Sequence, residues 1–278
     1  MFIKTGLKKT INLLVALTAK TFIGRYIFSE IIATLRSQIK KISHNEVELE
    51  FYIPNTLSLI RVDTFSTKEP ETLDWIDSMP EGSIVWDIGA NIGLYACYAA
   101  MKKKCKVFAF EPSVFNLELL ARNIFINELT ELITIIPLPL SERLTASKLN
   151  MTSIEWGGAL STFDKSFGYD GQELRKMFEF TTVGLSMAEA VDILKIPKPD
   201  YIKMDVDGIE HLILKGGEEL LLDVKSILVE INDNFKEQAE ATERCLIAAG
   251  LHLTEKRCWQ EDSNSLADTT FNQIWHRK

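Results

Sequence analysis

Short apolar runs alternate with segments of helical spacing along residues 83–231. Strand-type runs cover 83–88, 106–110, 133–136 and 227–231, and a further run begins at Tyr201. Between these runs, apolar residues recur every three or four positions, which predicts helices. Strands that alternate with helices predict an α/β fold with a mostly parallel, doubly wound sheet.

Residues 45–80 precede this pattern and predict a β-hairpin followed by a helix. Apolar residues alternate with polar ones at Val47, Leu49, Phe51 and Ile53. Residues 54–56 then suit a turn, and residues 57–62 suit a returning strand. Pro70 is tolerated in the first turn of a helix, which residues 80–82 would end.

Residues 1–44 carry apolar residues at helical spacing, with basic residues between them. The apolar run at 11–17 is too short to cross a bilayer, which takes roughly 20 residues. No convincing cleavage site for a signal peptide follows it. We predict a basic amphipathic helical extension, which either rests on the inner face of a membrane or packs on the body or on a partner subunit.

Charge is distributed unevenly along the chain. The 278 residues carry a net charge of −8. Residues 1–41 contain eight Lys and Arg against Glu30 alone, so they carry +7 and the remainder carries −15. An acidic body argues against nucleic acid as the main substrate. The four cysteines have no C-x-x-C spacing, which favours reduced thiols in a cytoplasmic protein and gives a zinc site little support.

The stretch 83–93 combines a strand, an acid and two glycines. Gly89 and Gly93 allow the backbone to approach a ligand closely and leave N–H groups of the next helix free to bind it. The following strand ends at Glu111, close to the roughly 20-residue offset at which an acid binds a ribose. A dinucleotide site would need glycine in place of Asp87, and an acid there would repel phosphates. The pattern predicts a pocket for a nucleoside that carries a cation or an amino acid.

Three motifs together resemble those of the FkbM family of S-adenosylmethionine-dependent methyltransferases. They cover residues 85–93, 109–113 and 202–210, and the resemblance extends from about 67 to 230. It implies a Rossmann-like class I methyltransferase fold with a C-terminal antiparallel strand. It also implies S-adenosylmethionine as the methyl donor and transfer to a hydroxyl oxygen of a sugar, glycan or secondary metabolite. Asp207 departs from the family, which usually has glutamate at this position.

The motifs and the resemblance together assign ten residues to the donor site. These are Asp87, Gly89, Ala90, Asn91, Gly93, Glu111, Pro112, Ser113, Leu140 and Ser141. Asp87 would orient the methionine part, and the two oxygens of Glu111 would accept both ribose hydroxyls. Leu140 and Ser141 follow the third strand, where the adenine ring would lie.

Asp205 and Glu230, at the ends of the fourth and fifth strands, are the candidate catalytic residues. In-line methyl transfer requires the enzyme to hold the acceptor oxygen and to take its proton. Asp205 would be the base, hold the base, or face the methionine part, with Glu230 nearby. A Mg²⁺ site of Asp205, Glu230 and Asn232 or residues 233–234 is a weaker alternative, so we predict no metal. Residues 144–182, rich in Ser, Thr and Gly and without regular period, are interpreted as a lid over the acceptor site, or alternatively as a plain insertion.

Two further hypotheses stay open. An N-methyltransferase acting on nucleic acid or protein is disfavoured, because the fourth strand lacks the Asn/Asp-Pro-Pro-aromatic motif common in the enzymes that methylate nucleic acid. A non-catalytic module that binds S-adenosylmethionine is disfavoured by the intact acids and glycines. The predicted partner is a small-molecule or saccharide acceptor, and the sequence makes no prediction of oligomeric state.

Overall fold

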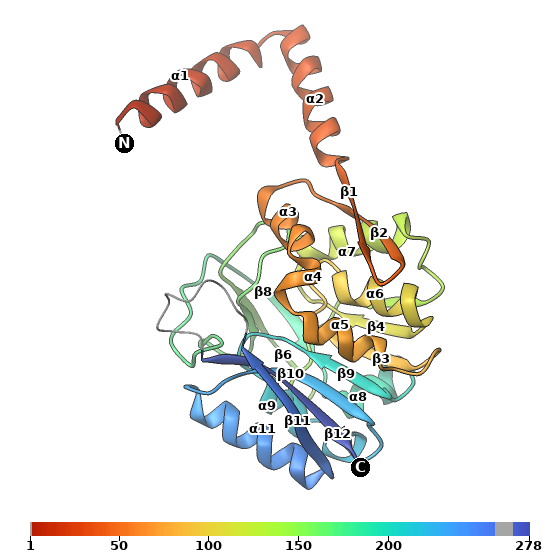
Figure 1. Ribbon diagram of the computed structural model, residues 1–278. Coiled ribbons are helices and arrows are strands. Elements are labelled where there is room, and N and C mark those ends of the chain that lie inside the picture. Colours follow the sequence, from red (N-terminus) through yellow and green to blue (C-terminus); the bar gives the residue numbers. More distant parts are fainter. Residues whose placement is uncertain (1, 259–268) are drawn as a thin grey trace.

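A seven-stranded sheet forms the centre of the molecule. The computed structural model describes residues 2–258 and 269–278 (Figure 1). The strand order is β11-β12-β10-β9-β3-β4-β5. The strands are β3 (Ile84–Ile88), β4 (Lys106–Phe110), β5 (Ile133–Ile136), β9 (Tyr201–Met204), β10 (Ser226–Asn232), β11 (Leu251–Cys258) and β12 (Thr270–Arg277). From β5 to β10 all neighbours are parallel, and β12 pairs antiparallel with both β10 and β11. The predicted Rossmann-like α/β sheet with a C-terminal antiparallel strand is confirmed.

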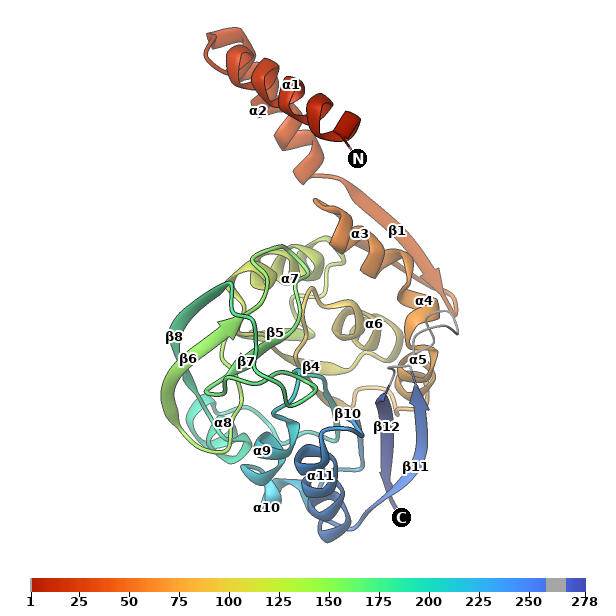
Figure 2. The same ribbon diagram turned by 90° about the vertical axis from the view of Figure 1, so that its left-hand side faces the viewer.

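Helices cover both faces of this sheet (Figures 1 and 2). One face packs on α5 (Pro70–Asp77), α6 (Leu94–Lys103) and α7 (Val114–Ile126), and the other on α8 (Met187–Leu194), α9 (Glu210–Lys215), α10 (Glu218–Leu221) and α11 (Lys236–Ala248). The capping box predicted at Ser186 is present, because its hydroxyl accepts the Glu189 N–H while the Glu189 carboxylate accepts the Ser186 N–H. Side chains alternate between the faces along each strand. Val85 therefore lies in the first core, and Trp86 and Ile88 lie in the second.

The N-terminal hairpin is present, but its second strand comes before residues 47–52 and not after them as predicted. Its strands are β1 (Ile39–His44) and β2 (Val47–Tyr52), and residues 56–63 form α3 (Thr56–Asp63) instead of a returning strand. The cause is a local capping box, in which the Asn55 side chain accepts the Ser58 N–H. The short helix α4 (Phe65–Lys68) then leads into α5, which has Pro70 in its first turn as predicted.

Residues 144–182 contain a second sheet that the sequence pattern did not predict. The strands β6 (Thr145–Met151), β7 (Ser161–Phe163) and β8 (Phe178–Gly184) pair antiparallel in the order β7-β6-β8. The apolar residues Ala146 and Val183 are exposed, whereas the polar residues Thr145, Ser147 and Thr182 are half-buried, which hides the alternation in the sequence. Residues 152–160 and 164–177 connect these strands, and both connections reach the cavities described below.

The helical extension projects from the body (Figures 1 and 2). It comprises α1 (Phe2–Thr18) and α2 (Phe22–Arg36), and it ends at Arg36, earlier than the predicted boundary of 44, because β1 begins at Ile39. Within the described residues, no single helix has the length and apolar composition needed to cross a membrane. The segments 9–18 and 22–36 meet those criteria only when taken together, and they are bent by 116° relative to each other.

Candidate functional site

The turn after β3 depends on glycine. Gly89 has a φ of +88°, and a Cβ atom there would lie 1.9 Å from the Asp205 carbonyl oxygen. Gly93 has a φ of +85° at the start of α6, where a Cβ would lie 2.5 Å from Leu120 Cδ1. The two glycines therefore let the β3 turn lie directly against the end of β9 and let α6 pack against α7.

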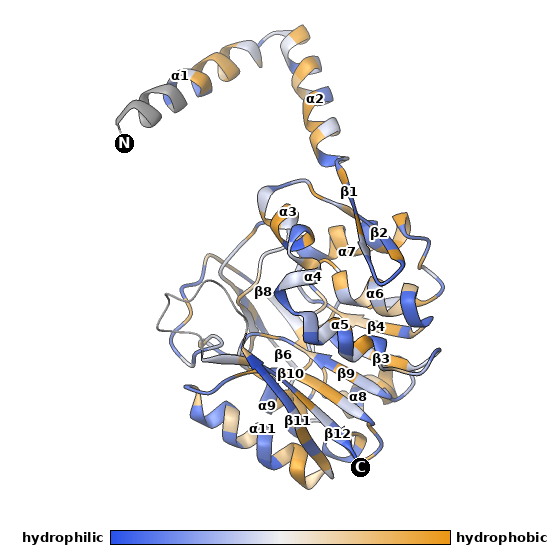
Figure 3. Ribbon diagram, viewed as in Figure 1, coloured by the Kyte–Doolittle hydropathy of each residue, from blue (hydrophilic) through white to orange (hydrophobic). Residues whose placement is uncertain are grey.

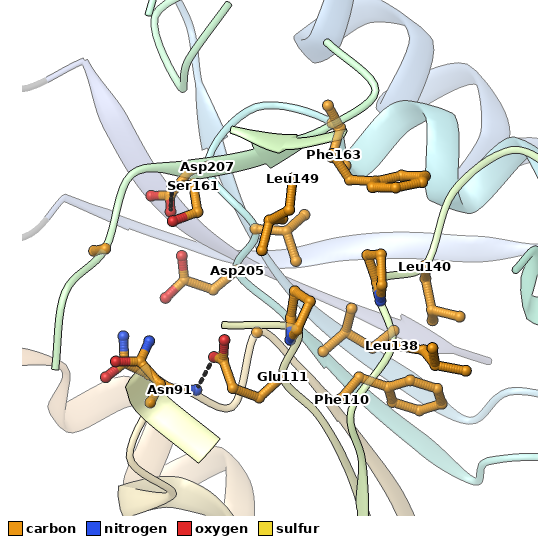
Figure 4. A pocket seen from close by; sticks show the side chains of 18 of the residues that line it. Asn91, Phe110, Glu111, Leu138, Leu140, Leu149, Ser161, Phe163, Asp205 and Asp207 are labelled. Atoms are coloured by element: carbon orange, nitrogen blue, oxygen red, sulfur yellow. Dashed lines mark hydrogen bonds between the residues drawn. The ribbon is translucent and has the colours of Figure 1, made fainter. Parts of the chain in front are cut away.

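Glu111 joins this turn to the end of β4. The Asn91 N–H donates to Glu111 Oε2 at 2.7 Å (Figure 4). The Ser113 N–H donates to Glu111 Oε1 at 2.7 Å. Burial raises the pKa of Glu111 to about 7, although these hydrogen bonds act in the opposite direction. Gly89 and Glu111 thus line the same cavity.

This first cavity has an apolar end and a polar end, as Figure 4 shows. Phe110, Leu138, Leu140, Leu149 and Phe163 line the apolar end. Asn91, Glu111, Asp205 and Asp207 line the polar end. A flat apolar ring joined to a hydroxylated sugar has the same division of character, so the cavity suits a nucleoside.

Asp87 lies in a second, adjoining cavity, beside a buried lysine. Lys203 is the neighbour of Asp87 across the β3–β9 pair, and its Nζ lies 3.5 Å from Asp205 Oδ2 and 5.1 Å from the centre of the Tyr95 ring. Burial acts to lower the pKa of Lys203, but the surrounding carboxylates, Asp205 first among them, raise it above its ordinary value. Burial raises the pKa of Asp87 to about 6, while Lys203 acts to lower it. Asp87 Oδ1 is buried and has no hydrogen-bond partner among the described residues, so it can accept a hydrogen bond from a ligand.

A third cavity, of about 270 Å³, opens beside the other two. It contains the carboxylates of Glu69, Asp205, Asp207 and Glu230 together with the cationic side chains of Arg61 and Lys68. Burial, together with the charge of Asp205, raises the pKa of Glu230 well above its ordinary value. Asp205 lines all three cavities and therefore stands where they meet.

Residues 157–161 are fastened over the junction by polar side chains. Asn91 Nδ2 and Asn116 Nδ2 donate to the Gly158 carbonyl at 2.8 and 3.0 Å. Asp207 Oδ2 accepts the Leu160 N–H at 2.7 Å and the Ser161 N–H at 3.2 Å. Because of these bonds, the segment interpreted as a lid contributes walls to the cavities.

The other predicted residues occupy several positions. Ala90 lines the cavity of Asp87, and Pro112 lines that of Glu111. Ser113 caps α7 through its side chain. The Ser141 hydroxyl donates to the Arg143 carbonyl, and Ser141 lines a separate small cavity between β6 and α9, away from the residues around Glu111.

The alternative Mg²⁺ ligands are engaged elsewhere. Asn232 Oδ1 accepts hydrogen bonds from the Asn234 N–H and the Thr269 hydroxyl, and the carboxylate of Asp233 binds Lys256. Across residues 2–258 and 269–278, no group of three or more His, Cys, Asp or Glu residues is placed to hold a metal ion.

Sequence reasoning missed several residues that shape the site, among them Arg61, Lys68 and Asn116. Arg61 and Lys68 come from α3 and α4, and Asn116 comes from α7. Arg61 Nε donates to the Gly157 carbonyl at 2.6 Å, so it also fixes the covering segment. Only the capping pair Asn55 and Ser58 could have indicated that α3 turns toward the site as a helix.

Known proteins are similar to this chain over more than half of its length. A family model described as "Methyltransferase FkbM domain" matches residues 87–254. The hexuronic acid methyltransferase AglP of Haloferax volcanii is 28% identical over 163 residues, which cover 56% of this chain and 59% of AglP. The chain thus spans less than two thirds of AglP. Methyltransferase sdnD of Sordaria araneosa is 27% identical over 221 residues, covering 69% of this chain and 82% of sdnD.

Solved structures are similar at lower identity. M. jannaschii TYW2 in complex with AdoMet has a TM-score of 0.43 and 14% identity, covering 86% of this chain and 87% of TYW2. Precorrin-6y C5,15-methyltransferase from Geobacter metallireducens has a TM-score of 0.45 and 14% identity, covering 76% of this chain and 87% of that protein.

Proposed function

Because the chain belongs to the FkbM methyltransferase family, we propose that it transfers a methyl group from S-adenosylmethionine to a hydroxyl oxygen of a saccharide or a related polyol. The observation that carries the proposal is the position of Asp205 at the junction of the nucleoside-type cavity and the carboxylate-rich cavity. A carboxylate at such a junction can take a proton from an acceptor while the donor occupies the adjoining cavity.

The residues present fit S-adenosylmethionine. Glu111 would accept hydrogen bonds from the ribose hydroxyls, and the apolar end beside Phe110 and Leu138 would hold the adenine. The unpartnered Asp87 oxygen would accept a hydrogen bond from the ammonium of the methionine part. When bound, this cofactor supplies a methyl group made electrophilic by the sulfonium. Membership of the FkbM methyltransferase family supports the same donor.

The acceptor cavity favours a ligand with several hydroxyl groups. Carboxylates accept hydrogen bonds from hydroxyls strongly, and Asp205, Asp207 and Glu230 all line this cavity. The similarity to a hexuronic acid methyltransferase supports a saccharide as the acceptor class. Arg61 and Lys68 balance part of the negative charge and would orient the acceptor from the side of α3 and α4.

Asp205 is the proposed base, and Glu230 is the proposed hydrogen-bonding partner of the acceptor. Lys203 forms an ion pair with Asp205 and so fixes the direction of its carboxylate. Burial raises the pKa of Glu230, which favours its protonated form, and a protonated carboxyl can donate to an oxygen of the acceptor. With the cofactor bound, Asp205 would take the proton of the acceptor hydroxyl as this oxygen bonds to the methyl carbon, and the electron pair of the broken carbon–sulfur bond would stay on sulfur.

Binding and turnover are tested separately. Calorimetry with S-adenosylmethionine should show binding by the wild-type chain and by Asp205→Asn. Methyl transfer to a panel of saccharides, including hexuronic acids, should occur with the wild type and fall by at least about a hundredfold in Asp205→Asn. Absence of donor binding would remove the enzyme assignment. Binding with no transfer to any hydroxyl acceptor would favour the non-catalytic module, and transfer only to nitrogen acceptors would overturn the proposed acceptor.

A further inference from the structure

The helices α1 and α2 leave a large apolar surface without cover. Twelve of their apolar side chains are between 45% and 78% exposed. We call this set the extension surface: Ile11, Leu13, Leu14, Val15, Leu17, Phe22, Ile23, Tyr26, Ile27, Ile31, Ile32 and Leu35. Figure 3 shows apolar positions in orange along both helices, and Figures 1 and 2 show the helices projecting from the body. An exposed apolar surface of this size marks a contact with a protein or a membrane.

We propose that the extension surface docks on the face of an anionic lipid bilayer, with both helices lying in the headgroup region. On α2, Ile23, Ile27, Ile31 and Leu35 follow one another at four-residue intervals and so form a single stripe. Arg25 and Arg36 lie on the opposite side of α2 from this stripe, as expected for a helix with a basic polar face at a membrane interface.

The bend between the helices favours lying on the bilayer over crossing it. Fifteen residues of α2 extend about 22 Å, which is shorter than the roughly 30 Å hydrocarbon core. The 116° bend is built in, since the Thr21 side chain accepts the Gly24 N–H. A Cβ at Gly24 would lie 1.9 Å from the Thr18 carbonyl oxygen, so only glycine allows this close approach.

Charge identifies the anionic bilayer as the partner. Lys9, Lys20, Arg25 and Arg36 are all exposed on the extension, against Glu30 as the single acid of residues 9–36. The body carries the opposite charge, so an anionic lipid surface attracts the extension and repels the rest of the chain. Two copies meeting through their extensions would place like charges together, which opposes self-association through this surface.

Docking also brings residues 157–161, which cover the junction of the cavities, close to the membrane. The Arg36 guanidinium, at the end of α2, lies 5.2 Å from the ring centre of Trp156. Trp156 immediately precedes the two glycines whose backbone binds Asn116 and Asn91 over the cavities. The base of the extension therefore rests on the covering segment.

Flotation of the purified full-length chain with lipid vesicles tests the proposal. The chain should float with vesicles of phosphatidylcholine containing about a third phosphatidylglycerol, and bind at least about tenfold more weakly to phosphatidylcholine alone or at high salt. The triple variant Ile23→Glu, Ile27→Glu, Ile31→Glu should lose binding. The matched variant Ile193→Glu, Leu222→Glu, Ile247→Glu changes three similarly exposed body residues by the same charge and should float like the wild type.

Circular dichroism should show both triple variants folded. Failure of the wild type to float, or equal loss in the two variants, would overturn the proposal. A dimer that light scattering detects in the wild type and not in the extension variant, without vesicle binding, would assign the surface to a second copy. Binding that is equal on neutral vesicles and resists high salt would contradict docking through charge at the bilayer face.

Discussion

Gly89 and Gly82 have the same left-handed backbone in very different surroundings. Gly89 has a φ of +88° with the Asp205 carbonyl oxygen 1.9 Å from the Cβ position, whereas Gly82 has a φ of +77° with nothing within 4 Å. We expect Gly82→Ala to cost about 1 kcal/mol from backbone strain alone. Gly89→Ala should cost more than about 3 kcal/mol, because backbone atoms at the end of β9 must also move. Urea unfolding of both variants measures the difference, and equal losses would contradict this account of the turn.

Glu111 predicts a pH dependence of donor binding. Its pKa is raised to about 7 by burial, and the ribose hydroxyls would bind its ionised form. Because the acid is protonated below its pKa, affinity for S-adenosylmethionine should fall about tenfold between pH 8 and pH 6. Glu111→Gln should bind at least about tenfold more weakly at pH 8 and show a flatter profile.

Calorimetry at several pH values measures this profile. Glu131→Gln, at an exposed position away from the cavities, is the matched control and should follow the wild type. A Glu111→Gln variant with wild-type affinity would show that Glu111 does not contact the donor.

At the scale of elements, α7 fixes the hairpin to the body through buried asparagines. Asn123 Oδ1 accepts the Tyr52 N–H at 2.9 Å, and Asn123 Nδ2 donates to the Ile92 carbonyl at 2.8 Å. Asn123→Ala should destabilise the fold by about 2–4 kcal/mol, because both backbone groups lose a buried partner. Thermal unfolding compared with Asn234→Ala, at an exposed asparagine, measures the effect. A loss below about 0.5 kcal/mol in both variants would contradict the anchoring role.

The sequence predicted the elements whose signals are local. The strand 106–110 and the turn at Gly89 carry strong apolar and glycine signals, and the structure brings Asp87, Gly89 and Glu111 to adjoining cavities. Residues 57–62 were assigned to a strand because Leu57 and Leu59 alternate, although the cap at Asn55 begins a helix.

The rest of the site depends on contacts between distant segments. Arg61 reaches the cavity because it binds Gly157, a residue 96 positions later in the chain. Asn116 likewise holds Gly158 across 42 positions. Periodicity reports only the immediate neighbours of a residue, so these pairings could not be read from the pattern. The same limit hid β6 and β8, whose pairing brings together two polar segments more than twenty residues apart.

At the scale of the whole molecule, the boundary between extension and body lies before β1. β1 pairs along its length with β2, whose residues Val47, Leu49 and Phe51 are buried in the first core. We predict that a chain of residues 38–278 keeps the donor affinity and thermal midpoint of the full chain, because residues 9–36, the part of α1 and α2 whose side chains the structure describes, contribute none of the residues that line the three cavities.

A chain of residues 45–278 should behave differently. It lacks β1, so the backbone groups of β2 lose their partners and the exposed edge favours aggregation. Differential scanning calorimetry and light scattering should show a lower midpoint and larger particles for 45–278 than for 38–278. If 38–278 binds S-adenosylmethionine tenfold more weakly than the full chain, the extension takes part in the donor site. If 45–278 is as stable as 38–278, the hairpin is not part of the folded body.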